Sequence, residues 1–230
     1  MDLNSFLQAF LATSTPVLPA LPLSKAAYPI FWAALFAWLA LALGGRLRPP
    51  VRLAFVALVV VWALLPGDWS PVYWLGLAFQ MPSWTSVLLA LAGVAALLRK
   101  SAPVSAVPLP LLFLASVMGW VMLLDLFVYL PFALYRWGFS VAAVAVAVVV
   151  AALLWRDGGD RSAGLAGEQA AVASAQGRQW WPWLLPAVLL LFVITRLPSG
   201  NVFDALLDPW LWLAAQVALV KRLWLMAKRP

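Results

Sequence analysis

The chain has 230 residues, of which 66% are hydrophobic and 10% charged, and its mean hydropathy is +0.98. A water-soluble domain carries about a quarter charged residues and under half apolar ones, and a chain of 25.0 kDa has too little interior to bury this excess. The composition therefore predicts an integral membrane protein, and it excludes a disordered chain because disorder requires low hydrophobicity.

The chain contains neither cysteine nor histidine. Disulfides, thiolate metal sites and the usual haem, copper and di-iron sites are excluded, as are Ser-His and Cys-His catalytic pairs. We therefore predict no catalytic residue, no metal site and no cofactor. The net charge is +7, and the basic residues are scattered between apolar stretches. This distribution favours the interpretation that cationic residues are retained on the cytoplasmic side of a membrane, and it argues against a nucleic-acid partner.

Residues 1–25 precede the first long apolar stretch and are predicted to lie on the periplasmic side. Within them, Asn4–Thr13 has the pattern of a short amphipathic helix lying in the membrane interface. Seven stretches that follow approach the roughly 20 apolar residues that a membrane-spanning helix needs. They are Ala26–Leu43, Val51–Pro66, Ser83–Leu98, Pro108–Phe127, Ser140–Trp155, Trp181–Leu197 and Pro209–Leu225. The third stretch has an alternative start at Pro71, with a kink at Pro82, and Pro71–Phe79 is otherwise a re-entrant or interfacial segment.

The distribution of charge predicts the orientation of these spans. With the N-terminus outside, the outer segments hold only Lys25, Arg136 and Arg196, and the inner segments hold the other twelve basic residues. This alternation satisfies the positive-inside rule. The predicted fold is an all-α, polytopic bundle of about seven transmembrane helices, N-out and C-in, in a bacterial inner membrane. A five-span part (26–155) and a two-span part (181–230) flank a Gly- and Ala-rich linker (156–180), expected to be flexible and cytoplasmic.

Small residues recur at helical spacing in two of the spans. Ala143, Ala147 and Ala151 share one face of the fifth span, and Ala115 and Gly119 share one face of the fourth. Small side chains let helix backbones approach closely in lipid. These faces indicate helix packing, either within the chain or against another subunit.

Tryptophan is also frequent, with 15 copies, many of them near predicted span ends. They are Trp69, Trp74, Trp84, Trp137, Trp155, Trp180, Trp181, Trp183, Trp210 and Trp224. Such a distribution is typical of the interfacial aromatic belt. The alternative interpretation is stacking of the indoles against a lipid-linked sugar or an amphipathic substrate.

Asp125 is the most informative polar residue of the spans. A rise of about 1.5 Å per residue places it roughly 24 Å along the fourth span, inside or at the outer rim of the hydrocarbon core. A carboxylate at that depth is costly unless it is paired, hydrated or protonated. Arg136 and Arg196 are its candidate partners, with Lys25 a third. The alternatives are a structural ion pair, a proton- or ion-linked role, and contact with a substrate.

Three further carboxylates, Asp68, Asp204 and Asp208, fall in the predicted outer segments. Together with Asp125 and the outer cations they form a set that is able to bind a cation, orient a headgroup or supply an acid–base pair. The simpler alternative is a solvated loop surface.

Three classes of function remain. The leading hypothesis is a non-enzymatic accessory or assembly subunit of a membrane complex, whose partners are the bilayer and other membrane subunits. The first alternative is a small-solute or ion transporter that uses Asp125. The second is an enzyme that modifies lipid headgroups at the outer face, with Asp125 or Asp68 acting beside Arg136 or Arg196.

Overall fold

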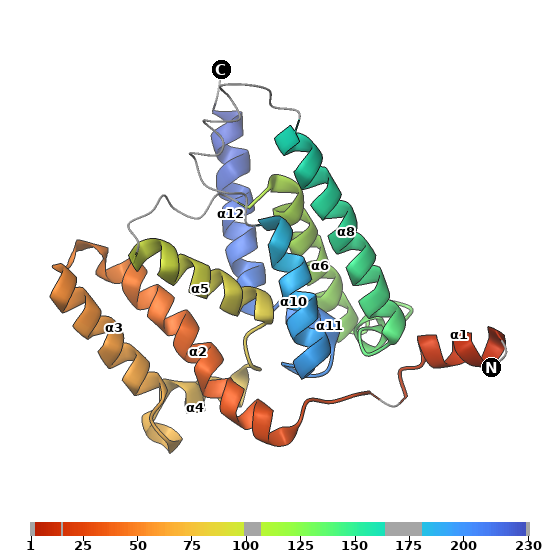
Figure 1. The fold of residues 1–230 in the computed structure, drawn as a ribbon, viewed down its shortest axis with the longest axis horizontal. Coiled ribbons are helices and arrows are strands. Elements are labelled where there is room, and N and C mark those ends of the chain that lie inside the picture. Colours follow the sequence, from red (N-terminus) through yellow and green to blue (C-terminus); the bar gives the residue numbers. More distant parts are fainter. Residues whose placement is uncertain (1–2, 15, 99–106, 164–180, 229–230) are drawn as a thin grey trace.

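The computed structural model describes residues 3–14, 16–98, 107–163 and 181–228, and all regular secondary structure in these ranges is helical (Figure 1). The predicted all-α class is confirmed for this part of the chain. The first half contains α1 (Leu3–Leu11), α2 (Leu21–Leu43), η1 (Gly44–Arg46), α3 (Pro49–Ala63), η2 (Gly67–Trp69), α4 (Pro71–Ala78) and α5 (Trp84–Leu98). The second half contains α6 (Leu109–Leu126), α7 (Leu134–Trp137), α8 (Val141–Ala163), α10 (Trp181–Thr195), α11 (Val202–Leu206) and α12 (Pro209–Ala227).

The ends of these helices follow local chemistry in the sequence. Helices α2, α3, α4, α6, α10 and α12 each carry a proline in their first turn. Proline suits this position because its fixed φ is helical and its missing N–H would have no intrahelical partner there. At the other end, α2 stops at Leu43, where the Gly44-Gly45 pair begins a 3-10 turn.

Helices occupy all seven stretches predicted to cross the membrane, but they differ in length. The three that are long and apolar enough to span a bilayer by length and composition are Leu21–Arg46, Leu109–Leu126 and Pro209–Ala227. Four others are shorter apolar helices: Pro49–Ala63, Trp84–Leu98, Val141–Leu154 and Pro182–Thr195. The structure therefore supports a helical membrane protein with three candidate spanning helices.

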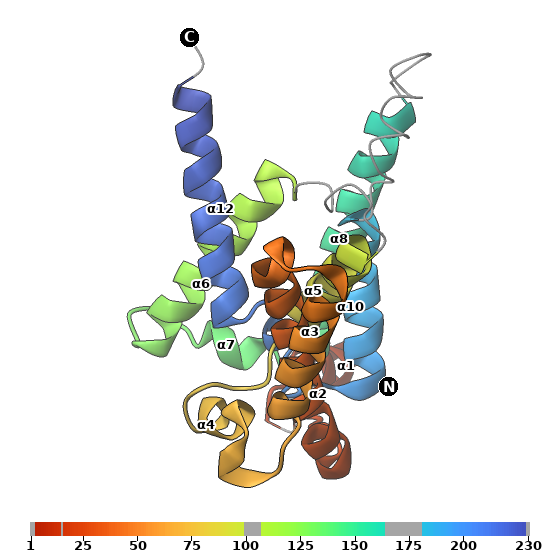
Figure 2. The same ribbon diagram turned by 90° about the vertical axis from the view of Figure 1, so that its left-hand side faces the viewer.

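The helices pack in three groups. Helix α2 lies against α3 and α5, α6 lies against α12, and α8 lies against α10, while α5 also contacts α10 and α12. Figure 2 separates the α6–α12 pair from the α8–α10 pair, with α2 and α3 toward the viewer. In Figure 1, α4 and α11 lie near the lower end of the molecule, and the C-terminus of α12 lies at the upper end.

The small-residue face of α8 packs within the chain. Ala143 and Ala151 are buried against Val188 and Phe192 of α10, and Ala147 packs against the same cluster. The face predicted from the four-residue spacing therefore serves the α8–α10 contact.

Three other contacts place an aromatic ring directly over a glycine of a neighbouring helix. Trp212 of α12 covers Gly119 of α6, Trp38 of α2 covers Gly93 of α5, and the Tyr28 hydroxyl of α2 reaches Gly76 of α4. A Cβ at Gly119 or Gly93 would lie closer than 3.0 Å to atoms of the indole ring. Trp212 also donates an Nε1–H bond to the carbonyl of Ser116, at 3.2 Å. These positions hold the helix backbones at close range.

Trp84 joins two of the core clusters, although its position at a span end suggested a place in the interfacial belt. Its ring meets Phe31 of α2 edge-on, with centroids 4.5 Å apart, and its Nε1–H donates to Thr195 Oγ1 of α10 at 3.3 Å. Trp84 is therefore a packing residue between α2, α5 and α10.

The structure selects between the two alternatives for one segment and moves the start of another. Residues 71–98 do not form one kinked helix, because α4 ends at Ala78 and the chain is non-helical until α5 begins at Trp84. Helix α8 continues to Ala163, so the linker predicted to begin at residue 156 is helical at first, and the rest of it (164–180) lies outside the described residues. The Gly158-Gly159 pair does not stop α8, since a glycine costs a helix only about 1 kcal/mol.

Candidate functional site

Asp125 lies in the last turn of α6, and its carboxylate serves as a hydrogen-bond acceptor for the next helix. Oδ1 accepts from the backbone N–H of Leu134 at 3.0 Å, and Oδ2 accepts from that of Tyr135 at 2.7 Å. These are the first two residues of α7, whose N–H groups have no partner within the helix. Asp125, at the end of α6, therefore caps the start of α7 across the loop that joins the two helices.

Asp204, in the first turn of α11, is the centre of a small hydrogen-bonded cluster. Its Oδ2 accepts from the Tyr135 hydroxyl at 2.6 Å and from the Ser199 hydroxyl. Burial raises the pKa of Asp204, and the bonds from Ser199 and Tyr135 oppose that shift without cancelling it. Burial, followed by the bond to Asp204 and its negative charge, likewise raises the pKa of the Tyr135 phenol.

Asn201 completes this cluster and ties α11 to α7. The side chain is fully buried; its Nδ2 donates to the Tyr135 carbonyl at 2.7 Å, and its Oδ1 accepts from the Phe203 N–H at 2.9 Å. The Val202 N–H donates to the Gly138 carbonyl at 3.0 Å. A Cβ at Gly138 would overlap the Asn201 side chain, so only glycine permits this approach. These hydrogen bonds and the close approach at Gly138 hold α11 against the α7 segment.

Asp208 is a buried cap shared by two helices. Its Oδ1 accepts from the Leu211 N–H of α12 at 2.8 Å, and its Oδ2 accepts from the Ser83 N–H just before α5 at 2.7 Å. Both bonds satisfy backbone donors at helix starts, where a carboxylate also interacts favourably with the helix dipole. One carboxylate therefore fixes the start of α5 beside the start of α12.

The two arginines predicted as partners of Asp125 do not pair with it. Arg136 is exposed on α7, one residue beyond the amide that Asp125 binds. Arg196 follows α10 with a φ of 59°, the left-handed conformation that often ends a helix, and its guanidinium lies 5.4 Å from the Phe192 ring centre. Within the described residues, the Asp125 carboxylate is bound by backbone amides instead of an arginine.

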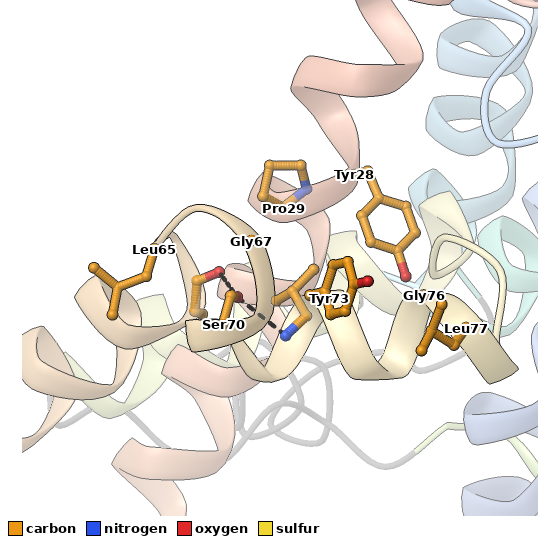
Figure 3. A pocket seen from close by; sticks show the side chains of 10 residues that line it. Tyr28, Pro29, Leu65, Gly67, Ser70, Tyr73, Gly76 and Leu77 are labelled. Carbon is orange, nitrogen blue, oxygen red and sulfur yellow. Dashed lines mark hydrogen bonds between the residues drawn. The ribbon is translucent and has the colours of Figure 1, made fainter.

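Asp68 belongs to a different part of the molecule. It is exposed in η2, between α3 and α4, where two open grooves flank the short helices. The first, of about 420 Å³, lies between α2 and α4, and Figure 3 shows the Tyr28 hydroxyl directed toward Gly76 across it. Ser70 fixes its floor by donating to the Ala63 carbonyl at 2.7 Å and accepting from the Val72 N–H.

The second groove, of about 500 Å³, is lined largely by aromatic side chains, and we call it the tryptophan groove. It is lined by Phe36, Trp62, Asp68, Trp69, Ser70, Pro71, Trp74 and Leu75. Asp68 is the one acidic residue in this lining, and the other carboxylates described above belong to α6, α11 and the start of α12. Asp68 therefore does not join Asp125, Asp204 and an arginine in a common pocket.

Sequence reasoning selected the carboxylates but missed the groups that bind them. Tyr135, Ser199, Asn201 and Ser83 were not among the predicted site residues, although capping patterns in the sequence carry part of this information. Asn201 Oδ1 accepts from the N–H of Phe203, two residues later in the chain. Ser83 Oγ accepts from the Ser86 N–H at 3.1 Å. Asn and Ser before a helix are common N-cap residues. The partners distant in the chain had no local signal.

The described residues contain no group of three or more Asp or Glu side chains able to hold a metal ion. Comparison of the chain with protein-family models, with curated proteins and with solved structures finds no match in any of the three. The fold and the carboxylate contacts define a class, a helical protein with three candidate membrane-spanning helices, in which Asp125 and Asp208 cap helix starts.

Proposed function

We propose that this protein is a non-enzymatic accessory or assembly subunit of a membrane complex. The observation that carries the proposal is the use of its carboxylates. Asp125, Asp204 and Asp208 each bind groups of their own chain that fix helix starts and loops. A transported ion or a substrate would have to displace these bonds, whereas a structural subunit needs them intact.

Helix α12 supplies a surface on which such a subunit would meet a partner. Only 6% of its apolar window is buried inside the chain, although it is long enough to cross a membrane. Its contact with α6 leaves an exposed stripe at helical spacing formed by Leu213, Val217, Val220 and Trp224. Such a stripe is open to lipid or to a helix of another subunit.

The proposed topology has seven crossings, with the N-terminus outside and the C-terminus in the cytoplasm of a bacterial inner membrane. Its support is the alternation of basic residues along the chain, together with apolar helices at each of the seven positions. The four shorter helices cross the bilayer in this proposal because their flanking residues and local thinning of lipid compensate for the mismatch.

Co-purification after mild solubilisation tests the proposal. A tagged chain is expected to bring down defined membrane subunits, and Val217→Trp on the exposed stripe of α12 is expected to reduce their recovery. Val149→Trp is the matched control, because Val149 is also exposed but lies on α8. Isolation of a monomer without partners, or equal loss with both variants, would contradict the proposal.

A second assay separates this proposal from the transporter hypothesis. Vesicles that contain the purified chain and a pH-sensitive dye are expected to show the same proton flux for wild type and Asp125→Asn. A wild-type flux that the variant abolishes, with unchanged helical content, would assign Asp125 to transport instead.

A further inference from the structure

The tryptophan groove has the chemistry of a binding site for a cation. Three of its indoles are largely exposed, at 52% for Trp62, 76% for Trp69 and 59% for Trp74. The face of an indole attracts a cation through its quadrupole, and tryptophan is the strongest of the aromatic residues in this respect. The groove therefore presents an electron-rich aromatic surface beside the carboxylate of Asp68.

Two of these rings are held in place by bonds to the η2 backbone. Trp62 Nε1–H donates to the Trp69 carbonyl at 3.0 Å, and Trp74 Nε1–H donates to the Asp68 carbonyl at 2.8 Å. Tyr73 meets the Trp74 ring edge-on, with centroids 5.4 Å apart. The donor edges of these two indoles are thus occupied, and their ring surfaces remain available to a ligand.

The carboxylate of Asp68 is available to a ligand, unlike those of Asp125, Asp204 and Asp208. In the described part of the chain its side chain has neither a hydrogen-bond partner nor an ion-pair partner, and the residue is exposed. The groove lining contains no lysine or arginine that would neutralise it. Charge complementarity therefore favours a positively charged group in the groove.

The position of the groove indicates that this group belongs to a lipid. The groove lies where the apolar helix α3 ends and α4 begins, so Asp68 is at the end of a predicted span, the level at which headgroups lie. On α3, Leu58 and Val61 next to Trp62 are 68% and 59% exposed, which continues the apolar surface toward the bilayer. An acyl chain has a surface to follow from the groove into the membrane.

We propose that the tryptophan groove binds a phospholipid whose headgroup carries an ammonium group. The ammonium lies against Trp69 and Trp74 and pairs with Asp68, and the acyl chains follow the exposed face of α3. This inference goes beyond the accessory function and does not depend on it, because the groove is formed by α2, α3, η2 and α4 alone.

Native mass spectrometry of the full chain in detergent tests this inference. The probe is an equal mixture of phosphatidylethanolamine and phosphatidylglycerol with identical acyl chains. The wild type is expected to retain the ethanolamine lipid about tenfold over the glycerol lipid, a ratio between those of an exposed and a desolvated cation–π contact. Asp68→Asn and Trp69→Ala are each expected to bring this ratio close to one.

Trp183→Ala is the matched control, because Trp183 is 59% exposed, as Trp74 is, and lies on α10, outside the tryptophan groove. It is expected to keep the wild-type ratio, and equal melting temperatures of all variants establish that the fold is intact. Equal retention of the two lipids by the wild type, or a ratio unchanged by Asp68→Asn, overturns the proposal. A co-purifying polypeptide that Asp68→Asn releases would also overturn it, in favour of a protein occupant.

Discussion

Substitution of Gly119 tests whether close approach of α6 and α12 stabilises the bundle. A Cβ added at Gly119 would lie closer than 3.0 Å to three atoms of the Trp212 indole. Since the contact is with a rigid ring, the ring must rotate or the helices must separate. Either change also weakens the bond from Trp212 Nε1 to the Ser116 carbonyl, which measures 3.2 Å.

The expected magnitude follows from three contributions. Overpacking of a closely packed contact costs about 1–3 kcal/mol, and the loss of one interhelical hydrogen bond in lipid costs about 0.6 kcal/mol. Alanine recovers about 1 kcal/mol relative to glycine through its higher helix propensity. Gly119→Ala is therefore expected to lower the free energy of unfolding by about 0.6–2.6 kcal/mol.

Reversible unfolding of the purified chain in mixed micelles measures this change. Gly45→Ala is the control, since a Cβ at Gly45 meets no atom within 4 Å, and it is expected to leave the free energy of unfolding unchanged or to raise it by up to about 1 kcal/mol. In a Trp212→Ala background the obstruction is gone, so Gly119→Ala is expected to become neutral or stabilising. Equal effects of Gly119→Ala in the two backgrounds would refute the reasoning.

Two further predictions concern the carboxylates of Asp208 and Asp204. Asp208→Ala is expected to lower the free energy of unfolding by about 2–4 kcal/mol, because it removes the cap of α12 and leaves the Ser83 N–H without an acceptor. The same unfolding assay in mixed micelles measures this change. A decrease below about 0.5 kcal/mol would contradict the shared cap. Asp204 gives a pH dependence: its pKa is raised from 3.8 by burial in the folded chain, so the folded state binds more protons than the unfolded state above that pH. The contribution of Asp204 to stability is complete below pH 3.8 and declines as the pH rises through the folded pKa, and Asp204→Asn is expected to flatten this part of the stability profile. An unchanged slope in that variant would show that another group controls it.

Local patterns in the sequence predicted much of the helical framework. The apolar stretches predicted helices at the seven positions where the structure has them, and the prolines and glycines located many of their ends. Regular spacing identified Ala143, Ala147 and Ala151 as one face of a helix, and that face packs on α10. These features depend on residues within a few turns of one another, so the sequence carries them directly.

The partners of the polar side chains were beyond the reach of such patterns. Sequence position placed Asp125 near two arginines, but the fold turns α7 so that its first amides reach the carboxylate. Asp204 and Tyr135 meet although 69 residues separate them, and Asp208 and Ser83 meet across 125 residues. An unsatisfied N–H at a helix start binds whichever acceptor the packing brings close.

Composition, period and charge order by themselves determined that this chain forms apolar helices and where many of them begin and end. Those properties follow from hydrophobicity and local backbone preference, which each residue carries with it. Only the tertiary structure decided that Asp125 and Asp208 cap helix starts, that Asp204 accepts from two hydroxyl groups, and that Asp68 is the one carboxylate in the tryptophan groove. The reason is geometric, because a hydrogen bond needs its atoms within about 3 Å, and helix packing sets that distance between residues far apart in the chain.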